Sequence, residues 1–491
     1  MPSRKDEHTS LLSKEVPFLQ TTFQEKLSIA KEITLAAIPN IFSSLGSQLK
    51  DVISLYFVGH LNNPLFFAAA GFGLTWLNAF GTAVIFGFAA GFGTLASQAF
   101  GAKNFYKLGL LYQKSIVVMT CLLALLISVL WFTKAELIML GFEEELASAI
   151  GHFIRYLMID LIFYMLFEVT KFYLIAQNLF EIPACILFIS TSLHIFWCHF
   201  FVNVMGLELI GMAIARTITD GTSMALLLIY VKLKNPCPES WFPWNKECLD
   251  GLVPYAKDIA SHGSSVYIEW IAFEMTTIIL GFLGDVTVLA AHSATLNYLF
   301  VNSTISLGLT LSMSVYVGNA AGEGSIIRAQ KYAYTGLIMN FLVVSCLDIL
   351  MFIFRGNIAA FYTSETNVNT LIMSMLTLYF CGMHGDLCCN TFAYLLRTLG
   401  QDKYVLKGFI CSYYGIGVTS SLIFSVWFGF GYYGVWGSLL LGCYVLLLFN
   451  FLRFKNLNWE LEVNKIYLEM RRKSINEESQ NQTELQNFSS Y

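Results

Sequence analysis

Two glutamates lie five residues apart within an apolar stretch, Glu269 and Glu274. The nearest Lys or Arg is Lys257 on one side and Arg328 on the other, so no basic residue close in the sequence can neutralise them. A charged side chain at the centre of a bilayer costs about 2.5–3.5 kcal/mol on insertion scales and therefore usually marks the path of an ion or a substrate. The pattern predicts transport, with the two carboxylates carrying an ion or a cationic substrate.

The same two glutamates can bind a proton and a cation in turn. Burial disfavours the charged form of a carboxyl group, which lets it hold a proton near neutral pH. Proton and cation then exclude each other, which is antiport in its simplest form. Five residues correspond to about 140° around a helix, so Glu269 and Glu274 cannot share one narrow face. The alternative is a structural pair hydrogen-bonded to neighbouring helices.

A third intramembrane acid, Asp386, lies in the apolar run from Cys381, close to His384. We expect Asp386 to belong to the proton or cation site, the alternative being a hydrogen bond that only fixes helix packing. His384 is expected to be a satisfied interior histidine. Aromatic and polar side chains suit a planar or cationic ligand. The candidate substrate-lining residues are Trp270, Phe273, His292, Asn297, Tyr298 and Tyr394.

The first half of the chain also carries charges in apolar stretches. They are Lys50, Asp51, Asp160, Glu168, Arg216 and Asp220. Arg216 and Asp220 are four residues apart and can pair on one helix face. Paired charges are more often structural, and the sequence leaves the role of this group open.

The composition is that of a polytopic membrane protein. The chain has 491 residues, of which 56% are hydrophobic and 13% charged, and its mean hydropathy is +0.61. A soluble domain would carry about 25% charged residues. The eleven cysteines have no zinc or disulfide spacing, and we find no nucleophile–base set or phosphate loop. We therefore expect no enzyme activity, metal, organic cofactor or nucleic-acid partner, and transport driven by an ion gradient.

Apolar segments long enough to cross a bilayer, about 20 residues each, recur in two sets of six. They are 32–58, 66–90, 108–132, 149–176, 183–204, 207–233, 257–283, 287–312, 328–354, 368–397, 405–429 and 432–453. This predicts an all-α protein with twelve transmembrane helices in two six-helix lobes. The predicted parts are an N-terminal segment at 1–31, an N-lobe at 32–233, a connector at 234–256, a C-lobe at 257–454 and a tail at 455–491.

Lys and Arg gather at one set of span ends, Arg397 among them. Only Lys134, Arg155 and Arg355 fall at the opposite set. Cytoplasmic loops carry the excess of basic residues in membrane proteins. Both termini are therefore expected in the cytoplasm, with the plasma membrane and a vacuolar or lysosomal-type membrane both open.

The two halves look like copies of one unit. The string that begins at Ser97 and includes Gln98 and Gly101 matches one that includes Asn319 and Gly322, with one constant offset of 221 residues. Two six-span copies enter the membrane from the same side and are related by an axis near the membrane normal.

Five motifs, in this order on twelve spans, resemble those of the multidrug and toxic compound extrusion (MATE) transporters, most closely the eukaryotic branch, over roughly residues 25–455. They are Phe57-Val-Gly59-His60-Leu61, Ser97-Gln98-Ala-Phe-Gly101-Ala, Glu269-Trp270-x-Ala272-Phe273-Glu274, Val317-Gly318-Asn319-Ala-x-Gly322-x-Gly324 and Leu396-Arg397-x-x-Gly400-Gln401. The chain departs from the family pattern at Ser192, His199, His292 and Tyr316.

The resemblance implies two lobes around a V-shaped cavity and export driven by inward H⁺ or Na⁺, with the acids at Glu269, Glu274 and Asp386. We predict a proton-coupled antiporter that exports organic cations, xenobiotics or metabolites, acting as a monomer surrounded by membrane lipid. A Na⁺-coupled exporter of the same family, a lipid or lipid-linked flippase of the same superfamily and a channel are the alternatives. A flippase is expected to present cationic side chains to phosphate, whereas the inferred C-lobe cavity has acids and no Arg.

Overall fold

The computed structural model of the protein describes residues 22–61, 63–283, 285–362 and 365–471, which are helical and contain no strand. The first half comprises α2 (Phe23–Gly59), α3 (Pro64–Leu77), α4 (Ala83–Gly101), α5 (Phe105–Trp131), α6 (Thr133–Met139), α7 (Glu144–Ala176), α8 (Glu181–Cys198) and α9 (Glu208–Lys234). The second half comprises α10 (Leu252–Phe282), α11 (Val286–Glu323), α12 (Ile326–Tyr362), α13 (Thr366–Thr398), α14 (Asp402–Phe409), α15 (Thr419–Leu422) and α16 (Gly431–Lys455).

Short π-helical and 3₁₀ pieces complete the chain. The π-helical pieces are η1 (Asn78–Thr82), η2 (His199–Val204), η5 (Ile410–Val418) and η6 (Ile423–Trp427), and the 3₁₀ turns η3 (Pro238–Ser240) and η4 (Lys246–Leu249) lie in the connector between the halves. Each π-helical piece continues the α-helix before it, so α3, η1 and α4 make one span, as do α14 to η6.

Side-chain caps mark where several spans begin. The Asn63 side chain accepts from the backbone N–H of Leu65, directly before a proline at the first helical positions of α3. Asn104 caps α5 in the same manner, and Asp285 accepts from two backbone N–H groups at the start of α11. These polar residues satisfy N–H groups that have no partner within the helix.

The predicted all-α fold is confirmed. Among the described residues nine helices are long and apolar enough to span a membrane, or ten if the bent pair within α13 is one span. The other two expected spans are α2 and α10, with 37 and 31 residues, which carry charged residues. Span α11 continues to Glu323, beyond the predicted end at 312. Its last part is rich in small and polar residues that pack between helices, so hydropathy did not mark it.

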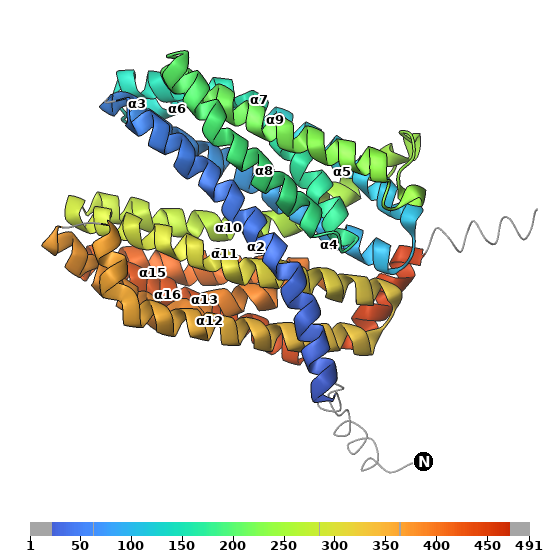
Figure 1. The fold of residues 1–491 in the computed structure, drawn as a ribbon. Coiled ribbons are helices and arrows are strands. Elements are labelled where there is room, and N and C mark those ends of the chain that lie inside the picture. The colour runs from blue at the N-terminus through green and yellow to red at the C-terminus, as the bar shows by residue number, and fades with distance from the viewer. Residues whose placement is uncertain (1–21, 62, 284, 363–364, 472–491) are drawn as a thin grey trace, which may run out of the picture.

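The helices form two bundles, α3 to α9 and α10 to α16, whose ribbons diverge at one end and approach each other at the other (Figure 1). At the approaching end, α4 finishes at Gly101 and α11 at Glu323. We call it the convergent end. The small pocket between the bundles near this end has a volume of only about 10 Å³, so the lobes are closed together here.

Two equivalent glycines bring the lobes together at the convergent end. A Cβ built on Gly101 would overlap the carbonyl oxygen of Asn319, and one built on Gly322 would overlap the carbonyl oxygen of Gln98. The contact is reciprocal between the two predicted sequence copies, which is what a pseudo-twofold axis between α4 and α11 produces. Gln98 also donates across the lobes to the carbonyl of Thr398, at 2.8 Å.

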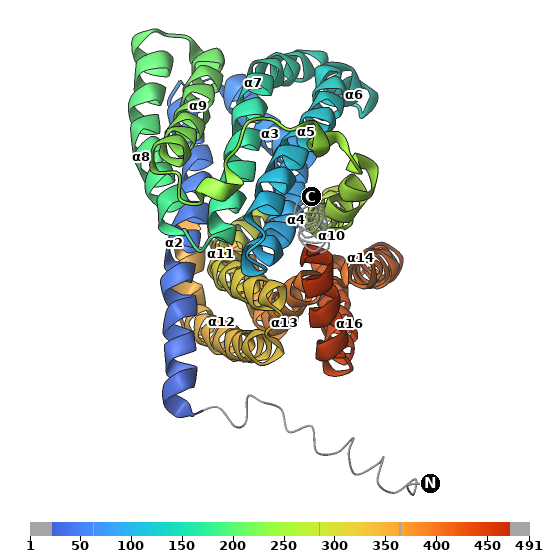
Figure 2. The ribbon, with the colours of Figure 1, turned by 90° about the vertical axis from the view of Figure 1, so that its right-hand side faces the viewer.

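Helix α2 contacts both lobes (Figure 2). Its first half bonds to the C-lobe, because Tyr332 of α12 donates to Glu32 at 2.5 Å and Asn40 donates to Ser312 of α11 at 2.9 Å. Its second half bonds to the N-lobe through Lys50. Pro39 lies within the part of α2 that contacts the C-lobe, because Asn40 and Gln48, which follow it, both bond to α11.

A helix at residues 459–471, which falls in the predicted tail, also touches both lobes. Its apolar side packs into the core, with Val463 and Met470 buried. From the N-lobe, Lys107 and Asn104 donate to its last carbonyls, at 2.7 and 2.8 Å. The rest of the predicted tail, 472–491, and residues 1–21 of the predicted N-terminal segment lie outside the described residues.

We expect Gly101→Ala to destabilise the protein, because the added methyl group overlaps the backbone of α11. Overpacking costs about 1–3 kcal/mol. The matched control is Gly71→Ala, in which the methyl group meets nothing within 4 Å and improves helix propensity. The midpoint of thermal unfolding should fall for Gly101→Ala and stay or rise for Gly71→Ala. Equal midpoints would contradict the close contact between α4 and α11.

Candidate functional site

Glu269 on α10 meets Asn390 on α13. The carboxylate Oε1 of Glu269 accepts a hydrogen bond from the Asn390 side-chain nitrogen at 2.5 Å, and both residues are partly buried. The carboxylate thus has a neutral amide donor, which supports a negative charge without cancelling it.

Asp386 lies one helical turn from Asn390, on the same face of α13. It is 4% exposed, and its Oδ1 accepts from the hydroxyl of Tyr413, in η5, at 3.0 Å. Asp386 and Glu269 are close enough for their charges to repel each other. We call Glu269, Asp386, Asn390 and Tyr413 the acid cluster.

The structure does not bring Glu274 into the acid cluster. It is half-buried and has no hydrogen bond or ion pair with any described residue. The angle of about 140° between Glu269 and Glu274 on one helix accounts for the separation. A coupling role for Glu274 stays a prediction.

The predicted substrate-lining residues separate into different environments. Phe273 is 6% exposed and packs against Tyr413 of the acid cluster, with ring centroids 6.1 Å apart. His292 is buried between helices, where its Nε2 lies 3.1 Å from the Thr277 hydroxyl. Trp270 is 42% exposed and lies 6.3 Å from the Phe300 ring.

The other lining candidates make local contacts. Asn297 donates to the carbonyl of Ser293 within its own helix, and Tyr298 is half-buried. Tyr394 is buried and lies under the guanidinium of Arg397, 5.0 Å from the ring centroid. Among the residues that the structure describes, Phe273 is the one lining candidate with a ring contact to the acid cluster.

Arg397 is more deeply buried than its position in the sequence indicates. It lies in the last turn of α13, at a span end as expected. It is also fully buried between the rings of Tyr394 and Phe409, and its nitrogens have no hydrogen-bond partner among the described residues. Its charge acts on Glu269. Because Arg397 is fully buried, the expectation that the C-lobe cavity has acids and no Arg stays a prediction. Position near the end of an apolar run hid the burial, although Arg397 stands in one of the recognised motifs.

Asn390 and Tyr413 were also missed, because neutral polar residues in an apolar helix give no distinctive sequence signal. Among the described residues, no group of three or more His, Cys, Asp and Glu side chains is arranged to hold a metal ion.

The buried charges of the N-lobe pair with one another. Lys50 contacts both oxygens of Asp220, at 2.5 and 2.6 Å, and Arg216 bonds to Asp160 at 3.0 Å and to Asp51. The expected pairing of Arg216 with Asp220 on one helix face is replaced by these pairs, because α2 and α7 bring other partners closer.

The remaining pair of the N-lobe group is Glu168 with Lys171, at 2.5 Å. Both belong to α7 and are buried. The arrangement supports a structural role, which the sequence analysis had left open.

Lys50→Met should be strongly destabilising, because it leaves Asp220 buried without its partner. Breaking such a pair from one side costs about 3–5 kcal/mol. Lys134→Met is the control, since Lys134 pairs with Glu144 at the surface, where a pair is worth about 0–1 kcal/mol. Unfolding by SDS titration in mixed micelles measures both. Equal free energies of unfolding for the two variants would contradict a structural role for the Lys50–Asp220 pair.

A family model described as MatE matches residues 39–200 and 264–423, which together exceed half of the chain. The chain belongs to the MatE family. The model matches once in each half, in agreement with the internal duplication. The MATE resemblance drawn from the five motifs is thereby confirmed.

Relatives and solved structures agree with this assignment. The chain is 28% identical to Protein DETOXIFICATION 17 of Arabidopsis thaliana over 451 residues, covering 91% of this chain and 93% of the relative. It is 24% identical to Multidrug and toxin extrusion protein 1 of Homo sapiens over 444 residues, covering 90% and 76%. The crystal structure of the eukaryotic MATE transporter AtDTX14 matches with a TM-score of 0.85 at 22% identity, covering 91% of this chain and 99% of that one. This MatE protein is thus a multi-pass membrane transporter with the twelve-helix MATE fold.

Proposed function

We propose that this MatE protein is a secondary antiporter that exports organic cations in exchange for protons. The observation that carries the proposal is the acid cluster, in which Glu269 and Asp386 lie near each other within one lobe. With both carboxylates ionised and Arg397 charged, the group has one negative charge in excess. One proton or one monovalent organic cation cancels that excess, so each displaces the other.

A second acid near Arg397, Asp402, does not add to this excess. Asp402 pairs with His262 at 3.3 Å, and its side chain is 27% exposed, so its charge is screened by water. Glu269 and Asp386 have only neutral hydrogen-bond donors among the described residues.

The closed convergent end determines from which side of the membrane the acid cluster can be reached. The distribution of Lys and Arg places this end in the cytoplasm, with both termini. With that orientation, access from the cytoplasm is blocked at the convergent end, and we propose that protons reach the acid cluster from outside. Rearrangement of the lobes exposes the cluster to the cytoplasm, where an organic cation displaces the proton.

The names of the relatives support the substrate class, since they include multidrug and toxin extrusion proteins and detoxification proteins. Coupling to protons, action as a monomer and residence in a plasma or vacuolar-type membrane belong to the same proposal.

Efflux of a fluorescent organic cation from proteoliposomes under an imposed pH gradient tests the proposal. Glu269→Gln and Asp386→Asn should each lower the initial rate by roughly tenfold or more, the factor that 1.4 kcal/mol represents. Glu144→Gln, at an exposed glutamate, is the matched control and should leave the rate unchanged.

Three outcomes would overturn parts of the proposal. Full activity in the Glu269 and Asp386 variants would remove the acid cluster as the coupling site. Efflux that follows a Na⁺ gradient and ignores the pH gradient would establish the Na⁺-coupled alternative. Movement of a fluorescent phospholipid instead of any cation would favour the flippase, for which Arg397 could hold the phosphate.

Glu274→Gln has its own expected outcome. If the half-buried Glu274 carries a proton independently of the acid cluster, its neutral variant should insert normally and lose nearly all gradient-driven efflux. Size-exclusion profiles of the purified variant check the insertion and fold, and the proteoliposome rate checks the coupling. Normal efflux would remove Glu274 from the coupling site and leave the roles of Glu269 and Asp386 standing.

A further inference from the structure

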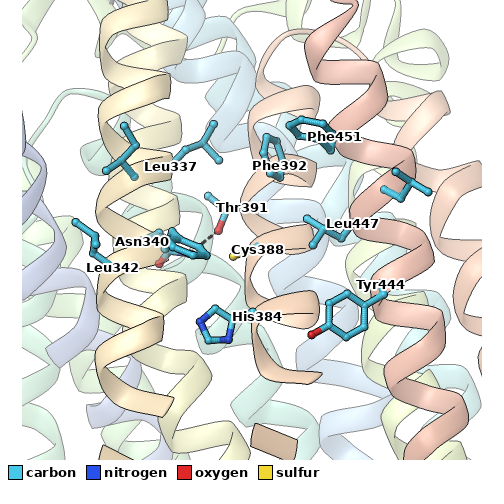
Figure 3. Close-up of a pocket in the computed structure, with 13 residues that line it drawn as sticks. Leu337, Asn340, Leu342, His384, Cys388, Thr391, Phe392, Tyr444, Leu447 and Phe451 are labelled. Carbon is cyan, nitrogen blue, oxygen red and sulfur yellow. Dashed lines mark hydrogen bonds between the residues drawn. The ribbon is translucent and has the colours of Figure 1, made fainter. Parts of the chain in front are cut away.

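A pocket of about 570 Å³ lies between α12, α13 and α16, apart from the acid cluster (Figure 3). Its lining residues on α13 include His384 and Cys388, about 200° around that helix from Asp386. The helices α12 and α16 lie on the side of the C-lobe turned away from the N-lobe (Figure 2). The pocket is therefore separate from the space between the lobes.

The walls are apolar and open toward the membrane. They are formed by Leu337, Ile338, Phe341, Leu342, Phe392, Leu447, Leu448 and Phe451. Phe341 is 52% exposed and Leu448 57%, on a surface that faces lipid in a membrane-spanning bundle. The volume lies within the usual range of about 300–1,000 Å³ for sites that bind small organic molecules. A molecule dissolved in the bilayer can enter sideways.

One end of the pocket is polar and holds a buried acid. His384 is 31% exposed, and its Nδ1 lies 2.8 Å from Oδ2 of Asp348, whose side chain is fully buried. The other ring nitrogen of His384 lies 2.9 Å from the hydroxyl oxygen of Ser345.

Hydrogen bonding and burial fix the number of protons on this pair. The Ser345 hydroxyl donates its one proton to the carbonyl of Phe341, at 2.7 Å, so it accepts from Nε2–H of His384. Nδ1 of His384 lies 2.8 Å from Oδ2 of Asp348, but neither Asp348 oxygen has a hydrogen-bond partner among the described residues. A carboxyl group that is fully buried and without a hydrogen bond holds a proton, because an unpaired buried charge is costly. With this proton and the one on Nε2, the His384–Asp348 pair has no net charge.

Loss of the carboxyl proton leaves one negative charge at the end of the pocket. The titratable side chains around the pair are Tyr298 from α11, Tyr379 and Cys388 from α13 and Tyr444 from α16. Tyrosine and cysteine side chains are neutral near pH 7, so none of them supplies a compensating positive charge. A cation in the pocket can supply it.

The hydrogen-bonding groups that line the pocket also favour a ligand that donates a hydrogen bond over one that only accepts. Thr391 and Tyr444 donate their hydroxyl protons to the carbonyls of Leu387 and Cys381. The Asn340 amide donates to Thr391 at 2.7 Å, whereas its Oδ1 has no partner among the described residues although Asn340 is 1% exposed. An anion would find no free hydroxyl here, whereas an ammonium group finds an acceptor.

We propose that this pocket is a second binding site, which takes an amphipathic amine from the bilayer. The apolar body lies between α12 and α16, and the ammonium group lies toward Asn340 and the His384–Asp348 pair. Binding releases the carboxyl proton to water, so the ammonium replaces it as the positive charge beside Asp348. This inference does not depend on transport, because binding needs neither a gradient nor the acid cluster.

Cys388 reports occupancy directly, because it lines the pocket. Replacing the exposed Cys121, Cys185, Cys381 and Cys411 by alanine leaves Cys346, which is exposed on α12 and outside the lining, as an internal control. The purified variant in lipid nanodiscs is labelled with N-ethylmaleimide, and mass spectrometry gives the rate at each cysteine. Decylamine should slow labelling of Cys388 roughly tenfold more than equimolar decanol, a difference of about 1.4 kcal/mol. Neither compound should change the rate at Cys346.

Decylamine should protect Cys388 more strongly than decanol, and this difference should increase with pH up to the pH at which the amine itself loses its proton. The reason is that the His384–Asp348 pair must release a proton when the ammonium group binds. Asp348→Asn should abolish this difference while both compounds still protect through their chains. Leu447→Trp, which fills the pocket, should abolish protection by both compounds. This variant tests the proposal even if Asp348→Asn fails to fold. Equal protection by amine and alcohol in the starting protein, or an unchanged preference in Asp348→Asn, would overturn the proposal.

The same experiment separates this site from the proposed function. Glu269→Gln should retain protection of Cys388 even where efflux is lost. Loss of protection in Glu269→Gln would show that the amine binds at the acid cluster, and the pocket would then have no independent role.

Discussion

The two lobes can meet only because glycine occupies the same place in both sequence copies. At the convergent end the backbones of α4 and α11 touch around Gly101 and Gly322, where any side chain would overlap a carbonyl oxygen. The same small-residue packing recurs along α4 at Gly87, whose added Cβ would lie 2.9 Å from the carbonyl of Gly263 on α10. Close backbone approach of this kind is how membrane helices associate without a hydrophobic driving force. It brings α10, and with it Glu269, against the other lobe.

Buried charge is handled differently in the two lobes. In the N-lobe, Lys50 and Arg216 are paired with acids from other helices, which links α2, α7 and α9 into one unit. In the C-lobe, Glu269 and Asp386 receive neutral donors, and Arg397 is held between aromatic rings without a hydrogen bond among the described residues. Paired charges stabilise an arrangement, whereas incompletely compensated ones respond to protons and cations. The division suits one rigid lobe and one that carries the exchange.

The spans and their order could be predicted because bilayer thickness imposes a run of about 20 apolar residues on each helix. The grouping of the acids could be predicted only in part. Helix geometry separates Glu269 from Glu274, and Asp386 was expected at the same site, but the sequence could not show that Asp386 rather than Glu274 lies near Glu269. Asn390 could not be foreseen because a neutral amide has no distinctive pattern, and the burial of Arg397 could not be foreseen because a position at a span end does not reveal burial.

Helix α2 connects the two lobes, because ion pairs near its two ends join it to different lobes. Near its start Glu25 pairs with Lys331 of α12, where both side chains are partly exposed, and farther along Lys50 pairs with the buried Asp220 of α9. Between these anchors Pro39 lacks the N–H that would complete the helix ladder. Any rotation of one lobe relative to the other therefore strains α2. Asn40 and Gln48 hold α2 to α11 beyond Pro39, so the C-lobe contacts of α2 extend almost to Lys50. A relative rotation of the lobes therefore acts mainly on the short part of α2 between Gln48 and the buried charge network of the N-lobe.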